Sequence, residues 1–179
     1  MNHSETRILT THTGSLPRKD QLSKILIAQE EGEPINERLL AGLAKEGVQH
    51  CVHKQLEAGV DIINDGEQPR VGFQTYVAQR LEGFGGVSQR EAFTDFADYP
   101  DFGEVWARRG KTAKVFDAPA ADAEVRYTNL RLASEEFDMF DSALGEVSGD
   151  FSEKFMTAAS PGIICTTMGN QFYDSHEDY

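Results

Sequence analysis

The 179-residue sequence has little of several features that mark specialised classes of protein. Its two cysteines, Cys51 and Cys165, are too few for a disulfide scaffold and fit a reducing cytoplasm. Its 17 basic residues stand against 30 acidic ones, so the net charge of −13 argues against nucleic acid or an anionic membrane as a partner. No apolar run approaches the roughly 20 residues of a membrane span, and the N-terminus lacks a signal-peptide pattern. The composition therefore predicts a cytoplasmic globular domain.

The stretch from Ile8 to Arg18 is the first candidate for function. Ile8 to Thr11 is apolar and β-branched, and it passes through His12, Thr13, Gly14 and Ser15 into a helical pattern. A strand that ends in a small-residue turn before a helix presents backbone N–H groups and a hydroxyl at one point. Such a turn suits a carboxylate or a phosphate, although many turns of this composition only reverse the chain.

Helix and strand patterns alternate along the first part of the chain. A helix is predicted over Lys19 to Glu31, stopped by Gly32, and a second over about Glu37 to Ala58, capped by Asn36 and ended by Gly59. Val60 to Asn64 then reads as a short buried strand. The polar loop Asp65 to Arg70 follows the carboxyl end of that strand.

The second part of the sequence is less regular. The expected elements are a helix over Val71 to Leu81, irregular structure over about 85–122, a strand over Ala123 to Tyr127, a helix over Leu130 to Leu144, a buried strand over Lys154 to Ala159, and a helix beginning near Tyr173. Alternating strands and helices are typical of a (β/α)8 TIM barrel, which takes about 250 residues. We therefore expect one α/β domain, 1–179, forming about the first half of such a barrel, with an insertion around 85–122.

Three separated motifs resemble one known family. THTGSLPR, VDIINDGEQPR with FQTYVAQRLEGF, and FMTAASPGI occur in an order that resembles the catalytic barrel of cobalamin-independent methionine synthases and their short stand-alone relatives. The resemblance implies methyl transfer from 5-methyltetrahydrofolate to the thiol of homocysteine, without cobalamin. It also implies a zinc ion that binds the substrate sulfur, because a zinc-bound thiol is deprotonated at neutral pH.

The resemblance assigns roles to several residues. Ser15 matches a serine that contacts the amino-acid substrate, together with backbone N–H groups near Gly14, and Glu67 matches a glutamate that binds the substrate ammonium. The alternative for Glu67 is a turn carboxylate paired with Arg70. His12 lines the same pocket or is a structural histidine, and Asp65 orients the Glu67 turn. Arg18 meets a folate tail or, as the favoured interpretation, lies along the surface at a helix start.

The zinc ligands of the family, including a His-x-Cys pair, do not occur in this sequence. His50, Cys51 and His53 are the nearest imitation, but helical geometry turns Cys51 away from the two histidines. No catalytic or metal residue is therefore predicted. We expect a barrel segment that is inactive alone, with a second half-barrel chain or self-association as its partner. The alternatives are an amino-acid-binding module without catalysis, a transferase for another thiol, and a porphyrin-carboxylate decarboxylase, for which Arg7 and Arg18 supply too few arginines.

Overall fold

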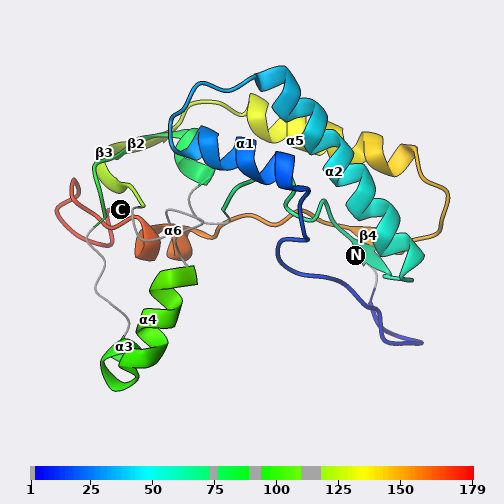
Figure 1. Ribbon diagram of the computed structural model, residues 1–179, viewed down its shortest axis with the longest axis horizontal. Coiled ribbons are helices and arrows are strands. Elements are labelled where there is room, and N and C mark those ends of the chain that lie inside the picture. The colour runs from blue at the N-terminus through cyan, green and yellow to red at the C-terminus, as the bar shows by residue number, and fades with distance from the viewer. Residues whose placement is uncertain (1–2, 73–75, 89–93, 110–117) are drawn as a thin grey trace. The chain divides into compact units, whose positions relative to one another are not determined.

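A computed structural model describes residues 3–72, 76–88, 94–109 and 118–179 (Figure 1). The described chain divides into two compact units. Unit 1 consists of Met1–Val71 and Arg131–Ala158, and unit 2 of Gly72–Leu130 and Ala159–Tyr179. Each unit has its own cluster of buried apolar side chains.

Three helices form most of unit 1: α1 (Asp20–Glu30), α2 (Glu37–Glu57) and α5 (Arg131–Gly145). They confirm the three helices predicted for these stretches. Local signals set the bounds of α2, because the Asn36 side chain accepts a hydrogen bond from the Leu39 N–H at 3.1 Å. At the other end, Gly59 takes a left-handed φ of 71° directly after the C-cap.

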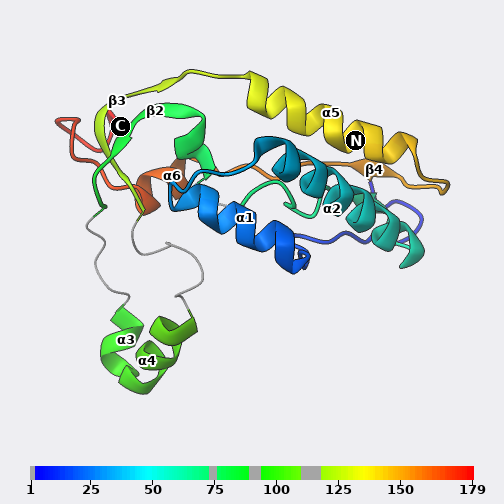
Figure 2. The same ribbon diagram turned by 45° about the horizontal axis from the view of Figure 1, so that its top comes forward.

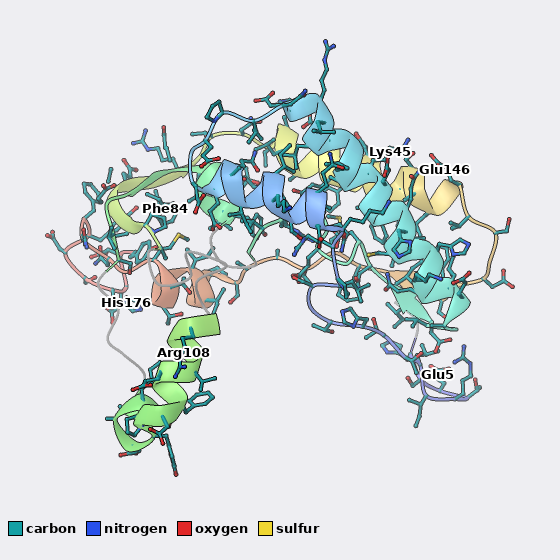
Figure 3. The ribbon with its side chains drawn as sticks, viewed as in Figure 1. Glu5, Lys45, Phe84, Arg108, Glu146 and His176 are labelled. Carbon is teal, nitrogen blue, oxygen red and sulfur yellow. The ribbon has the colours of Figure 1, made fainter. Side chains whose placement is uncertain are left out.

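The main core of unit 1 lies between α2 and α5, which run side by side in both views (Figures 1 and 2). Val48 and Val52 of α2 meet Phe140 and Ala143 of α5, all nearly inaccessible to solvent. Full burial of a valine or phenylalanine side chain stabilises the fold by roughly 1.5–3 kcal/mol. At the rim of the same contact, Lys45 lies 3.4 Å from the carboxylate of Glu146 (Figure 3).

A short parallel sheet lies beneath these helices. Strand β1 (Ile62–Ile63) pairs with β4 (Glu153–Lys154), and Thr11 makes an isolated parallel bridge to Ile62. The first two predicted strands thus occur in the expected parallel arrangement, but are much shorter than predicted.

The expected buried strand from Lys154 to Ala159 is wrong over most of its length. Only Lys154 belongs to a strand, and its side chain is exposed. The Phe155 N–H still donates to the Ile63 carbonyl of β1, but the backbone does not pair with that strand beyond this point. The carbonyl of Thr157 accepts a hydrogen bond from Arg70 instead.

Unit 2 contains an antiparallel pair, β2 (Leu81–Gly85) and β3 (Ala120–Tyr127), preceded by the 3-10 turn η1 (Tyr76–Gln79). The strand predicted at Ala123 is confirmed and begins three residues earlier. The helix predicted over Val71 to Leu81 is wrong among the described residues, and residues 73–75 lie outside them. Gly83 lies in β2 with φ 94°, where a Cβ would come 2.5 Å from the Glu124 carbonyl oxygen.

The region expected to be irregular contains two helices, α3 (Thr94–Asp98) and α4 (Pro100–Arg109). Proline is favoured in the first turn of a helix, and acidic residues there interact well with the helix dipole. Pro100 and Asp101 supply both features, and the rings of Phe96 and Phe102 pack 5.9 Å apart. The rest of this region includes residues 89–93 and 110–117, which lie outside the described part of the chain.

The last part of unit 2 also differs from expectation. Ser160 caps a further helix, α6 (Pro161–Thr167), in a stretch for which no helix was predicted. The helix predicted after Tyr173 is absent from this stretch of the described chain, which forms turns, although the Ser175 hydroxyl does accept the Asp178 N–H at 3.1 Å. Tyr179 instead folds back and donates to the Met168 carbonyl at 2.8 Å. Among the described residues, no helix combines the length and apolar character that crossing a membrane requires.

Candidate functional site

The turn that contains Gly14 and Ser15, called the Gly-Ser turn below, is joined by hydrogen bonds to the loop after β1 within unit 1. The Leu16 N–H donates to the Gly66 carbonyl at 3.0 Å, and the Gln68 side chain donates to the Leu16 carbonyl at 2.9 Å. Gly14 takes a left-handed φ of 98° in the turn. Its Cβ position is open, so the turn itself and not crowding requires glycine there.

Hydrogen bonds from α2 fix the start of the loop from Asn64 to Arg70. Gln55 of α2 accepts the Asn64 N–H at 3.1 Å and donates to the Asn64 carbonyl at 2.7 Å. The Asn64 side chain then accepts the Gly66 N–H at 2.8 Å and donates to the His12 carbonyl at 2.7 Å. Every residue of this loop except Pro69 is buried, so these contacts satisfy backbone groups that water does not reach.

Glu67 is the central residue of the loop, with only 5% of its surface exposed. Its carboxylate accepts two hydroxyl hydrogen bonds, from Ser15 at 2.6 Å and from Thr157 at 3.0 Å. Its backbone has φ 54°, the one positive value found at a non-glycine residue of the described chain. Such a conformation costs about 1–3 kcal/mol and is concentrated at functional sites. The two residues assigned by resemblance, Ser15 and Glu67, are thus in direct contact.

Asp65 fixes the Glu67 turn and a buried arginine. The Asp65 carboxylate accepts the Glu67 N–H at 3.0 Å, and Arg70 donates to both of its oxygens at 2.9 and 2.6 Å. Both charged side chains are at least 96% buried, at 4% and 2% exposure. Removing one partner of such a buried ion pair lowers the free energy of unfolding by about 3–5 kcal/mol, because the other charge stays buried without a partner. Arg70 was considered as the partner of Glu67, but its carboxylate partner in the structure is Asp65.

Arg18 has a role that neither sequence interpretation included. Its guanidinium donates to the Glu67 carbonyl at 2.6 Å and to the Gln68 carbonyl at 3.3 Å. Its side chain is therefore directed at the loop backbone and not along the surface. Burial lowers the pKa of Arg18 from its ordinary value, but arginine stays charged at any physiological pH.

His12 is half-buried at the edge of this site. A ring nitrogen, Nε2, lies 2.9 Å from the Gly14 carbonyl oxygen. This contact fits the interpretation of His12 as a structural histidine that supports the turn, and it leaves its role in ligand binding as a prediction. Three further residues of the site were assigned no role from the sequence, although they lie in the motifs that resemble the family. Thr157 lies in FMTAASPGI and was assigned to a strand, and Asn64 and Gln68 lie in VDIINDGEQPR.

A family model described as the catalytic domain of cobalamin-independent synthase matches residues 8–98 of this chain, just over half of it. The matched part contains the Gly-Ser turn and the whole loop around Glu67. This chain belongs to the cobalamin-independent synthase family.

The fold agrees with this family. The chain superimposes on a B12-independent methionine synthase from Shewanella sp. W3-18-1, solved in complex with selenomethionine, with a TM-score of 0.60 and 20% identity. The match covers 94% of this chain and 42% of that one. The chain therefore shares the fold of part of a cobalamin-independent synthase and spans less than half of that protein's length.

The residues that the structure describes do not fit the zinc ion that this family implies. Within the described ranges no group of three or more histidine, cysteine or acidic side chains is placed to hold a metal ion. Cys51 is buried, whereas His50 and His53 are exposed on α2. Burial raises the pKa of the Cys51 thiol to about 11, with the Asp65 carboxylate adding to the effect and Arg18 opposing it. A thiol with this pKa is protonated at neutral pH.

Proposed function

We propose that this chain contributes the amino-acid pocket of a cobalamin-independent methionine synthase. The reaction of that enzyme class is methyl transfer from 5-methyltetrahydrofolate to the thiol of homocysteine. The observation that carries the proposal is the buried carboxylate of Glu67, which accepts a hydrogen bond from the hydroxyl of Ser15, an exposed residue. The membership of residues 8–98 in the family supports the assignment of this pocket.

The ammonium of the substrate would bind at Glu67. Ser15 and Thr157 each donate one hydroxyl proton to this carboxylate. A carboxylate has about four lone-pair positions, so positions remain for an ammonium donor. The Ser15 hydroxyl, having donated its proton, also presents lone pairs to a cation. An ammonium group therefore finds two kinds of acceptor in one place, and its charge strengthens the hydrogen bonds that it donates.

The substrate carboxylate would bind at the Gly-Ser turn. The N–H groups of Gly14 and Ser15 donate to no acceptor among the described residues, and both residues are at least partly exposed. Successive N–H groups around a left-handed residue form a concave site for an anion. The turn and Glu67 together offer opposite charges for the two ends of a zwitterionic amino acid.

The described residues assign no chemical step of methyl transfer. In this enzyme class zinc supplies the activation of the thiol, and the ligands for it are not found in the described ranges. We therefore propose an incomplete (β/α)8 barrel that works together with a second half-barrel chain or another copy. The same absence of ligands favours a second candidate function, an amino-acid-binding module without catalysis. A transferase for another thiol would use the same ammonium and carboxylate contacts.

Titration calorimetry with L-methionine tests the pocket in the full 179-residue chain. We expect saturable binding, weakened tenfold or more by Glu67→Gln, because losing a charged partner of a buried hydrogen bond costs about 1.5–3 kcal/mol. Glu33→Gln is the matched control, since Glu33 is exposed and should leave the affinity unchanged. Equal affinity of the wild type and Glu67→Gln would refute the pocket.

Methyl-transfer activity separates the two candidate functions. Turnover that appears only when a second chain carrying a zinc site is added would support the half-barrel enzyme. Binding of L-methionine without turnover under any such combination would support the binding module.

A further inference from the structure

The carboxylate of Glu67 is held on both sides by residues from distant parts of the sequence. Ser15 donates to Oε2, and Thr157, 90 residues further along the chain than Glu67, donates to Oε1 at 3.0 Å. Ser15 is exposed, whereas Thr157 is only partly accessible. The two hydroxyl groups therefore belong to residues that differ in their exposure to solvent.

Thr157 is itself fixed by a closed ring of hydrogen bonds. Its carbonyl accepts Nη1 of Arg70 at 2.6 Å, and Nη2 of Arg70 binds both oxygens of Asp65. Asp65 in turn accepts the backbone N–H of Glu67 at 3.0 Å. The ring therefore runs from the Glu67 side chain through Thr157, Arg70 and Asp65 back to the Glu67 backbone. Buried polar networks of this kind rigidify a site when their members are satisfied.

We propose that Thr157 is a positioning residue for the ammonium subsite. This inference rests on the proposed function, in which Glu67 binds the ammonium of an amino acid. The Thr157 hydroxyl fixes the rotation of the carboxylate, so that its remaining lone pairs face the side where Ser15 lies. A glutamate side chain has three torsions, and an unrestrained one loses conformational freedom each time it binds a ligand. Thr157 fixes that orientation before the ligand arrives.

Two substitutions and two ligands test this role. Thr157→Val keeps the branched shape and removes the hydroxyl, whereas Thr157→Ser keeps the hydroxyl. L-methionine carries the ammonium, and 4-(methylthio)butanoic acid is the same molecule without it. We expect Thr157→Val to weaken L-methionine binding about fivefold to tenfold, as for one hydrogen bond. Binding of the acid without an ammonium should not change, and Thr157→Ser should bind L-methionine like the wild type.

Several results would overturn the inference. These are wild-type affinity of Thr157→Val for L-methionine, equal weakening of both ligands by Thr157→Val, and binding of L-methionine to Thr157→Ser that is as weak as to Thr157→Val. The second of these would indicate a merely structural role. Circular dichroism checks that each variant is folded, and Thr157→Ala replaces Thr157→Val if the latter does not fold.

Glu67→Gln separates failure of this inference from failure of the proposed function. If Glu67→Gln weakens L-methionine binding and Thr157→Val does not, only the positioning role fails. If Glu67→Gln has no effect, the ammonium pocket fails, and the role of Thr157 fails with it.

Discussion

Gly66 offers the sharpest test of how this loop is built. It precedes Glu67, has φ 64°, and lies against α2. A Cβ placed on it would come 2.9 Å from Sγ and 3.2 Å from Cβ of Cys51, and 3.1 Å from Cβ of Leu16. These distances are shorter than ordinary van der Waals contacts. Gly66→Ala therefore combines an unfavourable backbone conformation with a steric overlap inside the core.

The two costs can be estimated separately. An alanine in the left-handed region costs roughly 1–2 kcal/mol, and forcing a methyl group into a packed core costs about 1–3 kcal/mol more. Gly32→Ala is the matched control, because Gly32 has a similar φ of 75° but no atom within 4 Å of its Cβ position. Both variants gain similarly from the lower entropy of the unfolded chain. The difference between them should therefore be about 1–3 kcal/mol, the cost of the overlap.

Urea unfolding followed by far-ultraviolet circular dichroism measures this difference, because the three long helices of unit 1 dominate the signal. Gly66→Ala should also weaken L-methionine binding, since a shift of Gly66 moves Glu67. The pair Gly66→Ala/Cys51→Ala should recover part of the lost stability, because the closest atom is removed. Equal losses for Gly66→Ala and Gly32→Ala would refute the reasoning, since they would show that the Cys51 contact carries no cost.

Two further predictions concern pH. Burial raises the pKa of the Cys51 thiol to about 11. The contribution of this thiol to stability is therefore complete below the ordinary thiol pKa of about 8.5 and is lost as the pH rises through about 11. In thiol labelling of the native chain, Cys165 should react first and Cys51 only on unfolding, and rapid labelling of both would contradict this. Hydrogen bonds from Arg7, and then from the Thr10 backbone, hold the pKa of Asp61 well below its ordinary range. Its contribution to stability is therefore present above the unfolded pKa of about 3.9 and is lost as the pH falls through the lower folded value. In an acid titration followed by circular dichroism, Arg7→Gln should unfold at a higher pH than the wild type. Lys24→Gln is the control, because Lys24 is exposed, and it should unfold like the wild type. Identical curves for all three proteins would refute the role of Arg7.

Local signals in the sequence predicted the helices of unit 1 well. Asn36 and Gly59 define the ends of α2 through contacts within a few residues, and such contacts form wherever the rest of the chain lies. By contrast, the helix predicted over Val71 to Leu81 was wrong among the described residues. The apolar spacing of this stretch fits a helix, but Leu81 pairs with Tyr127 in an antiparallel sheet. A strand partner more than 40 residues away leaves no trace in a local pattern.

The candidate site likewise has features that the sequence predicted and contacts that only the tertiary structure shows. The sequence by itself, through its resemblance to the family, predicted that Ser15 and Glu67 share one pocket and that Asp65 supports the turn; the structure places Ser15 against Glu67 and Asp65 on the Glu67 N–H. Only the tertiary structure decided that the two hydroxyls of Ser15 and Thr157 meet the Glu67 carboxylate and that Arg18 binds the loop carbonyls. These contacts join residues 49 to 90 positions apart. They arise because parallel pairing of short strands brings distant chain segments to one edge of the sheet, which residue type and spacing do not encode.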